Sequence, residues 1–433
     1  MQKENAVSKF GHFGKGWIMI LYVFLAYFLT TAVGSSMNVA AIRLSEEYGW
    51  SRTLLTSLVS VASYANIIAS FIVGAICVKK SAKKVSIVLG FIYAISVLAL
   101  GFTSNLLAFA LLMIIANSFS CAWGYQASPV LVSHWFPKKK GVVMGLVTIG
   151  IPLGAGMTSI IYNGAFDSLG IQWSFLPFAV LSIVALVILM TVLADHPEDV
   201  GYNPDNDKSM TREEAAKILA EEMKRDENSI WTTKKLLRTP QVWINSVTLG
   251  IQLLFASGLM VQIIPRLLEL GYDMGTATKM LMFSSLCAIV GSYICGLIDA
   301  KFGARKAAAS TFVIGILAMI LNITGTFVGI MLSLALIGVV VGGAANWPAS
   351  LSIEYWGRAN FSKGYGIIQP LIQLVGAIGP AFFAITAGIF GSYTFSYVSG
   401  AVLMLIGLIG FLTLTDPKFV QKEEAKLLEK KVI

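Results

Sequence analysis

Long apolar runs recur along the whole chain and alternate with short polar segments. A run of about 20 residues is long enough to cross a bilayer as an α-helix, which satisfies its backbone hydrogen bonds internally. The pattern predicts an all-α polytopic membrane protein with twelve transmembrane helices in two six-helix pseudo-symmetric halves. The expected spans are 16–41, 52–77, 85–103, 107–133, 141–165, 172–194, 241–265, 278–298, 306–325, 328–352, 364–389 and 393–415.

One long polar stretch, Asp195–Thr239, separates the sixth span from the seventh. Thr211 and Glu214 have the spacing of a capping box at the start of a short amphipathic helix in this stretch. Two interpretations of the helix stay open: a regulatory or gate-coupling helix, and a solvated linker between the membrane halves. The predicted domains are an N-terminal six-helix half (1–194), a cytoplasmic linker (195–240), a C-terminal six-helix half (241–415) and a cytoplasmic tail (416–433).

The positive charges are distributed asymmetrically over the loops. Of the 32 Lys and Arg residues, 28 fall in the termini, the linker and the loops on the same side of the membrane. The opposite loops hold only Arg43, Arg52, Arg266 and Lys279. Because cytoplasmic loops carry an excess of Lys and Arg, both termini and the linker are expected in the cytoplasm, around a multi-pass protein of the cytoplasmic (inner) membrane. The net charge of +9 then reflects topology, and no nucleic-acid partner is expected.

The composition agrees with a membrane protein. Apolar residues make up 56% of the chain and charged residues only 13%, with a mean hydropathy of +0.76. A soluble domain carries about 25% charged residues, so a soluble enzyme and a disordered protein are excluded. The four cysteines lie in or beside apolar runs and the three histidines are far apart. No metal site, catalytic residue or cofactor is therefore expected, and the expected partners are membrane lipid and a small solute bound by a monomer.

The two halves contain an internal repeat. Gly74–Lys84 aligns without gaps with Gly296–Lys306, 222 residues later, and each block enters a short basic turn after the second span of its half. Such parallel repeats are typical of transporters that bind substrate near the membrane midplane between two halves. Gly338 and Gly342, four residues apart, predict a close approach of span ten to a neighbouring helix.

These features resemble the major facilitator superfamily. Within it, His134–Gly145 contains Trp-Phe-Pro, three lysines and a glycine, and resembles a signature of the oxalate/formate antiporter family and the related monocarboxylate transporters. Gly16-Trp17, Glu46–Arg52 and Tyr355–Phe361 agree with this resemblance. It implies a secondary transporter with alternating access that moves a small organic anion by exchange or proton-linked symport, and it implies no enzyme.

The chain departs from oxalate carriers in one respect. They are expected to place a basic residue in span eight and another in span eleven, whereas these spans contain no Lys or Arg at mid-depth. A dianion would lose its hydration without meeting a counter-charge, so a monocarboxylate is the expected substrate. The alternatives are a neutral or zwitterionic solute, or a non-transporting membrane sensor on the same fold.

The polar residues left inside the spans are the candidates for substrate binding. The superfamily resemblance implies that spans one, four, seven and ten line the cavity. For each candidate the alternative is an interhelical hydrogen bond. The predicted substrate-binding residues are Tyr27, Tyr125, Gln252, Asn346, Trp347, Gln369 and Gln373.

Charged residues near the helix ends predict two further sites. Asp299 at the end of span eight is expected to form a cytoplasmic gate by pairing with a nearby base, foremost Arg358, with Lys301 and Arg305 as neighbours. Its repeat counterpart is Cys77, which predicts an asymmetric gate. At the external rim, long-range attraction by positive charges is expected to steer an anion inward. The predicted rim residues are Arg43, Arg266 and Lys279.

Overall fold

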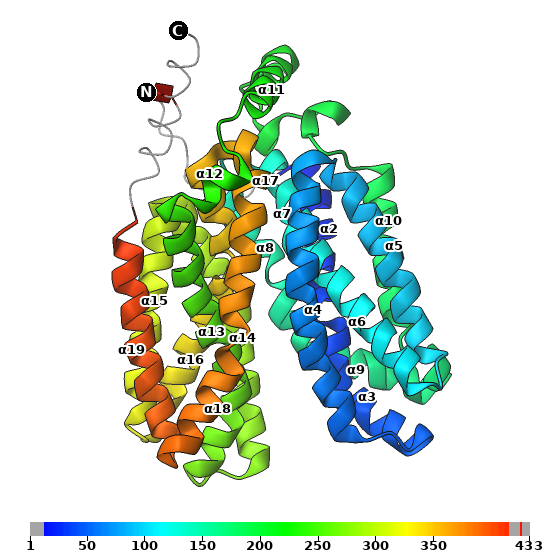
Figure 1. The fold of residues 1–433 in the computed structure, drawn as a ribbon, viewed down its shortest axis with the longest axis vertical. Helices are drawn as coiled ribbons and strands as arrows, with labels where there is room; N and C mark the ends of the chain where they lie inside the picture. Colours follow the sequence, from blue (N-terminus) through cyan, green and yellow to red (C-terminus); the bar gives the residue numbers. More distant parts are fainter. Residues whose placement is uncertain (1–12, 415–424, 427–433) are drawn as a thin grey trace. The chain divides into compact units, whose positions relative to one another are not determined.

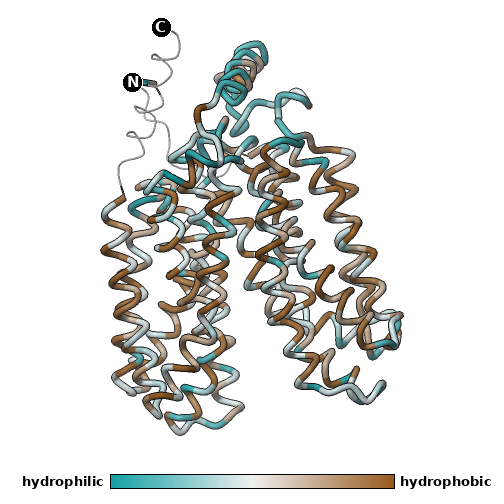
Figure 2. The backbone as a smooth tube through the Cα atoms, in the orientation of Figure 1, coloured by the Kyte–Doolittle hydropathy of each residue, from teal (hydrophilic) through white to brown (hydrophobic). Residues whose placement is uncertain are grey.

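The structure, a computed structural model, describes residues 13–414 and 425–426 (Figure 1). In this part of the chain, twelve helical segments are long and apolar enough to span a membrane and no strand is present, which confirms the predicted all-α polytopic fold. Hydrophobic residues dominate these segments, and hydrophilic ones dominate the linker helix (Figure 2). The predicted tail at 416–433 lies outside the described residues except for residues 425 and 426.

The helices fall into three groups along the chain. Those before the linker are α2 (Gly16–Thr30), α3 (Ala32–Tyr48), α4 (Arg52–Lys79), α5 (Ala82–Gly101), α6 (Leu106–Ala122), the π-helix η1 (Trp123–Ala127), α7 (Ser128–Trp135), α8 (Lys140–Val147), α9 (Gly150–Leu169), η2 (Ile171–Trp173) and α10 (Leu176–Thr191). The linker contains η3 (Pro197–Val200), η4 (Pro204–Asn206), α11 (Arg212–Glu227) and α12 (Thr233–Leu237). The remaining helices are α13 (Pro240–Glu269), α14 (Met274–Phe302), α15 (Ala304–Ile323), α16 (Phe327–Ala344), α17 (Trp347–Gly376), α18 (Gly379–Phe390) and α19 (Tyr393–Leu412).

Side-chain caps determine where many of these helices begin. Ser51, Asn105 and Asp273 each accept a hydrogen bond from the backbone N–H three residues later, at 3.0–3.3 Å. Such caps satisfy backbone groups that have no partner within the helix. The predicted capping box of α11 is confirmed, because Thr211 N donates to Glu214 Oε2 at 2.8 Å and Glu214 N donates to Thr211 Oγ1 at 3.2 Å.

Two helix ends differ from the sequence prediction. The first span continues seven residues past its predicted end and stops at Tyr48, where Gly49 adopts a left-handed conformation (φ +68°) and its N–H bonds to Ser45 O at 3.0 Å. A left-handed glycine is a common helix terminator, whereas hydropathy falls earlier, at Arg43. Span ten ends at Ala344, eight residues before its predicted end, and its remaining residues begin α17, the helix that continues into span eleven. This run is interrupted at Gly357, whose φ of +67° favours glycine.

Contacts divide the described chain into two compact units. The first contains the residues up to Val143, Gly150–Asn228 and Phe361–Gly366. The second contains Met144–Ile149, Ser229–Asn360 and the residues from Ile367 onward. Each unit thus includes one short segment from the half of the sequence that forms most of the other, and the start and end of α8 belong to different units.

The same helix pairing occurs in both units. In the first, α4 packs on α6, α5 on α10 and α3 on α9. In the second, α14 packs on α16, α15 on α19 and α13 on α18. In each case the second span of the half packs on the fourth, the third on the sixth and the first on the fifth. The internal repeat in the sequence therefore has a counterpart in the packing.

Glycines allow the closest of these helix contacts. A Cβ atom added to Gly338 would lie 2.4 Å from Ser284 O, and one added to Gly342 would lie 2.1 Å from Ala288 O. Backbones at this distance leave no room for a side chain. The predicted close approach of Gly338 and Gly342 is thus confirmed, and the neighbouring helix is α14.

A polar cluster in the second unit fastens the end of α8. Thr148 Oγ1 hydrogen-bonds to Asn346 Oδ1 and lies 2.7 Å from Ser292 Oγ. Asn346 Nδ2 donates to Ser292 O at 3.0 Å, and Ser292 Oγ donates to Gly145 O at 2.9 Å. All three side chains are buried, so each hydroxyl or amide has a partner where water is excluded.

We predict that Thr148→Val lowers the free energy of unfolding by about 1–3 kcal/mol, because the buried Asn346 oxygen loses its donor. Thermal unfolding in detergent micelles measures the change. Thr191→Val is the matched control: the Thr191 hydroxyl is exposed and bonds only to Val187 O of its own helix. Equal destabilisation by both substitutions would contradict the prediction.

Candidate functional site

Two of the predicted substrate-binding residues lie together in the first unit. The rings of Tyr27 on α2 and Tyr125 on η1 have centroids 5.6 Å apart and meet edge to face. Thr30 Oγ1 donates to Tyr27 O at 2.6 Å and lies 3.4 Å from the Tyr125 hydroxyl. This close approach requires Gly124, because a Cβ atom there would lie 2.3 Å from Thr30 Cγ2. The pair presents an aromatic face with a hydroxyl at its edge.

A third tyrosine, Tyr365 on α17, was not predicted from the sequence. Its hydroxyl donates to Tyr125 O at 2.6 Å, and its ring stacks on Phe361 with centroids 4.9 Å apart. Tyr125 O is available because Pro129, four residues later, has no N–H to donate and its ring disfavours regular helix there. The local π-helix and the bond from Tyr365 thus share one cause, which the Tyr-x-x-x-Pro spacing could have indicated.

Gln369 and Gln373 are buried on α17 of the second unit, four residues and hence one helical turn apart. Among the described residues, neither Oε1 atom has a hydrogen-bond partner. A primary amide carries two donors and an acceptor, and rotation of the amide group exchanges their directions. Both side chains therefore retain hydrogen-bonding capacity inside the span.

The other three candidates of the second unit are fully buried among neighbouring residues. Gln252 Nε2 hydrogen-bonds to Thr311 Oγ1 on α15, and Asn346 is part of the cluster around Thr148. Trp347 is fully buried in the hydrophobic core. The interhelical alternative is favoured for Asn346, whereas Gln252 Oε1 and Trp347 Nε1 have no partner among the described residues, so a part of these two in substrate binding stays a prediction.

The predicted gate residues lie at the ends and breaks of helices in the second unit. Asp299, in the last turn of α14, and Arg358, directly after Gly357, are both buried. Lys301 is exposed, and Arg305 reaches Leu412 O at 3.4 Å. The pairing of Asp299 with Arg358 stays a prediction. A further acid in this region, Glu354, accepts the N–H of Ala304 at 3.1 Å and caps α15.

The three predicted rim residues have different surroundings. Arg43 is partly exposed and contacts Asp167 Oδ1 and Asn163 Oδ1, both at 3.1 Å, whereas Lys279 is exposed. Arg266 is only 2% exposed. It donates to Glu269 Oε2 at 2.8 Å and to Asn322 Oδ1 at 3.0 Å, so its charge is neutralised within the helix bundle. This geometry favours a structural role for Arg266. Steering of an anion by Arg43 and Lys279 stays a prediction.

The charged side chains of the described spans lie within about two turns of a helix end or beside the break at Gly357. The described residues also include no group of His, Cys, Asp and Glu that could hold a metal ion. Neutral groups such as tyrosine hydroxyls and glutamine amides can bind a solute inside the described spans. The hydrogen bonds of such groups can orient a ligand and replace the hydrogen bonds that it made with water.

Twelve apolar helices, a repeated pairing of six, and neutral hydrogen-bonding groups inside them define a polytopic membrane transporter. Residues 23–380 match the family described as the Major Facilitator Superfamily. The chain therefore belongs to this superfamily, as the sequence resemblance predicted, and is a transporter and not an enzyme.

The relatives of this chain include monocarboxylate transporters. The chain is 21% identical over 304 residues to monocarboxylate transporter 10 of Homo sapiens, covering 66% of this chain and 55% of the relative. It is 27% identical over 225 residues to the phosphoglycerate transporter protein of Salmonella typhimurium, covering 51% of this chain and 46% of the relative. The chain thus spans about half the length of these two relatives.

Solved structures share the fold. The proton:xylose symporter XylE is similar with a TM-score of 0.71 at 15% identity, covering 92% of this chain and 96% of that one. The human organic anion transporter MFSD10 is similar with a TM-score of 0.69 at 13% identity, covering 92% and 100%. At these identities the likeness establishes the fold alone.

We predict that Tyr365→Phe destabilises the protein by about 1–3 kcal/mol, because Tyr125 O loses its donor in a buried site. Thermal unfolding in detergent measures the loss. Tyr93→Phe is the matched control, since the buried Tyr93 hydroxyl has no partner among the described residues. Pro129→Ala restores an N–H for Tyr125 O, so Tyr365→Phe should cost less in that background. Equal costs in both backgrounds would contradict the assignment.

We predict that Asp299→Asn slows solute exchange while membrane insertion stays normal, because removal of a buried charge leaves its gate partner unpaired. Initial exchange rates in proteoliposomes, normalised to inserted protein, measure the effect. Asp273→Asn is the control at the other end of α14, where Asn caps a helix as well as Asp does. Wild-type rates in the Asp299 variant would rule out the gate.

Proposed function

We propose that this transporter moves a small organic anion, foremost a monocarboxylate, across the cytoplasmic membrane, with both termini in the cytoplasm. The observation that carries the proposal is the pair of buried amides of Gln369 and Gln373, whose Oε1 atoms have no partner among the described residues. Rotation of either amide group would turn its N–H donors toward a carboxylate. Amide and hydroxyl donors can replace the hydration of one carboxylate. Two negative charges without a basic residue at mid-span would cost far more to desolvate.

The names of the relatives support an organic acid as substrate. One is a monocarboxylate transporter and another a phosphoglycerate transporter. The Trp-Phe-Pro segment and its three lysines, Trp135–Lys140, resemble the monocarboxylate transporters in the same direction. A neutral or zwitterionic solute is the competing candidate, since the same amides and hydroxyls would bind it.

For the coupling mode, exchange of one anion for another and proton-linked symport are both open to this fold. We favour exchange, because the described spans hold no carboxylate or imidazole at mid-depth that could take up a proton. In exchange the carrier reorients with substrate bound in both directions, and no separate protonation step is needed.

Counterflow in proteoliposomes tests the substrate class. Vesicles loaded with lactate should accumulate labelled lactate, and external oxalate, alanine or glycerol should compete poorly. Counterflow that responds to alanine or glycerol and not to lactate would replace the monocarboxylate with a zwitterionic or neutral substrate. A pH gradient imposed on vesicles without internal lactate should drive little uptake under exchange, and strong uptake would establish symport.

We predict that Gln373→Ala weakens the apparent affinity for lactate about ten- to a hundredfold, since a lost donor to a charged ligand costs about 1.5–3 kcal/mol. Concentration dependence of counterflow measures it. Gln172→Ala, at an exposed glutamine of η2, is the matched control. Unchanged affinity in the Gln373 variant would assign that residue to helix packing.

A further inference from the structure

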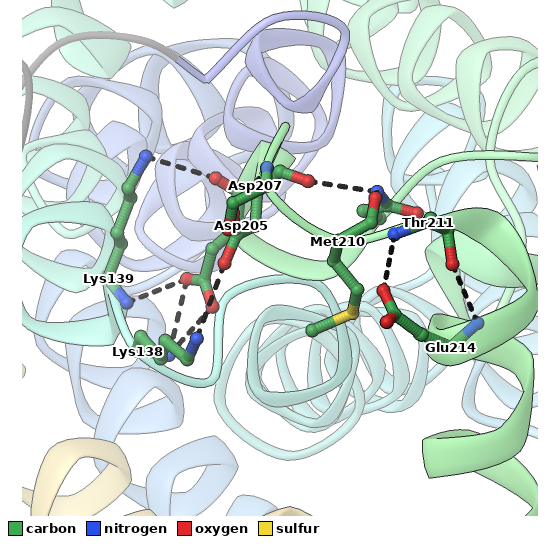
Figure 3. A network of polar contacts seen from close by, with 9 residues as sticks. Lys138, Lys139, Asp205, Asp207, Met210, Thr211 and Glu214 are labelled. Carbon is green, nitrogen blue, oxygen red and sulfur yellow. Dashed lines mark hydrogen bonds and ion pairs between the residues drawn. The ribbon is translucent and has the colours of Figure 1, made fainter.

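The linker contains a buried carboxylate that the transport site does not use. Asp205 in η4 is 3% exposed. Its carboxylate accepts the backbone N–H of Lys138 at 3.0 Å and that of Lys139 at 2.7 Å (Figure 3). Lys139 Nζ also donates to Asp205 O at 3.0 Å. The linker is thus joined to the loop between α7 and α8 by main-chain and side-chain contacts within the first unit.

A tightly determined turn presents this carboxylate. Asp205 and Asn206 both have positive φ, +58° and +53°, which non-glycine residues rarely adopt. Asn203 Nδ2 holds the turn by donating to Asp207 O at 2.9 Å and to Met210 O at 2.6 Å. Such conformations persist only where the surroundings over-determine them, and they are frequent at functional positions.

The two N–H groups lie directly before α8, which begins at Lys140. The N–H groups at a helix start have no partner within the helix and attract negative charge. Burial raises the pKa of Asp205, while the N–H groups and charges of Lys138 and Lys139 act in the opposite direction. The half-buried neighbour Asp207 differs, because hydrogen bonds from Ser209 lower its pKa. Only Asp205 is withdrawn from water to hold the helix start.

The position of α8 links this contact to the rest of the fold. Up to Val143 the helix belongs to the first unit, and from Met144 it belongs to the second, where Thr148 bonds to Asn346. Asp205 therefore fixes the beginning of a helix whose end is fixed in the other unit.

The last turn of α11, within the linker, makes a similar contact. Lys363 Nζ lies 2.6 Å from Asp226 Oδ1 and donates to Asp226 O at 2.7 Å. Lys363 belongs to Phe361–Gly366, the segment that carries Tyr365 and joins the first unit. The linker thus contacts the chain just before Met144–Ile149 and within Phe361–Gly366, the two short segments that each unit takes from the other half of the sequence.

We propose that Asp205 is a positioning residue of the transport cycle, which holds the start of α8 so that the linker determines the rate of conformational change. Substrate affinity is set elsewhere, inside the spans. The rate readout depends on the transport activity proposed above, but the effect on the loop does not.

Amide hydrogen exchange of the full-length protein in detergent tests the positioning. In Asp205→Ala, the amides of residues 138–143 should exchange about ten- to a hundredfold faster than in the wild type. Lys138→Ala is the matched control, because it removes an exposed ammonium group that contacts Asp207 but keeps the N–H that Asp205 accepts. Unchanged exchange in Asp205→Ala, or equal acceleration in Lys138→Ala, would overturn the proposal.

Counterflow kinetics test the role in transport. Asp205→Ala should lower the maximal lactate exchange rate about tenfold with the apparent KM nearly unchanged. A KM that rises without a fall in rate, or a maximal rate at or above that of the wild type, would overturn the role. Asp205→Asn keeps one acceptor oxygen, should show a smaller loss, and replaces the alanine variant if that fails to fold. If the wild type exchanges no monocarboxylate, the proposed substrate fails, while amide exchange still decides the positioning.

Discussion

The carbonyl oxygen of Tyr125 lacks the usual α-helical donor because Pro129 stands four residues later, and inside a membrane an unpaired carbonyl is costly. The Tyr365 hydroxyl supplies the missing hydrogen bond at 2.6 Å. This interaction holds Tyr365, in Phe361–Gly366, against η1 within the first unit, and the ring of Tyr125 packs on Tyr27. The aromatic part of the candidate site is therefore a consequence of a proline.

The helices could be predicted because each apolar run is long enough to require a hydrogen-bonded helix in lipid. The role of a polar residue within a span could not, because it depends on a partner distant in the sequence. Asn346 and Gln252 have the same composition signal as Gln373, yet Thr148 and Thr311 bond to the first two. A hydropathy pattern does not reveal which distant threonine hydroxyl will be the hydrogen-bond partner. Arg266 is similar, since Glu269 and Asn322 bind a buried guanidinium that was expected at the exposed rim.

The sequence also predicted the structure of the linker only in part. The capping box of α11 is visible in the sequence and present in the structure, but the main attachment is the turn at Asp205. The donors in that contact are backbone N–H groups, so no side-chain motif in the sequence could predict it. His134 and His196, whose stacked rings have centroids 4.2 Å apart, add a second attachment near the start of the linker. Residues 195–228 of the linker thus belong to the first unit, whereas its last residues, from Ser229, belong to the second.

The contact of Gly338 and Gly342 with α14 has a mechanical consequence. Because the backbones of α14 and α16 pack this closely, we expect the two helices to move together in a rearrangement of the second unit. Compliance must then reside where the backbone is irregular. Gly357, left-handed and without a neighbour within 4 Å of an added Cβ, is such a joint between the two parts of α17.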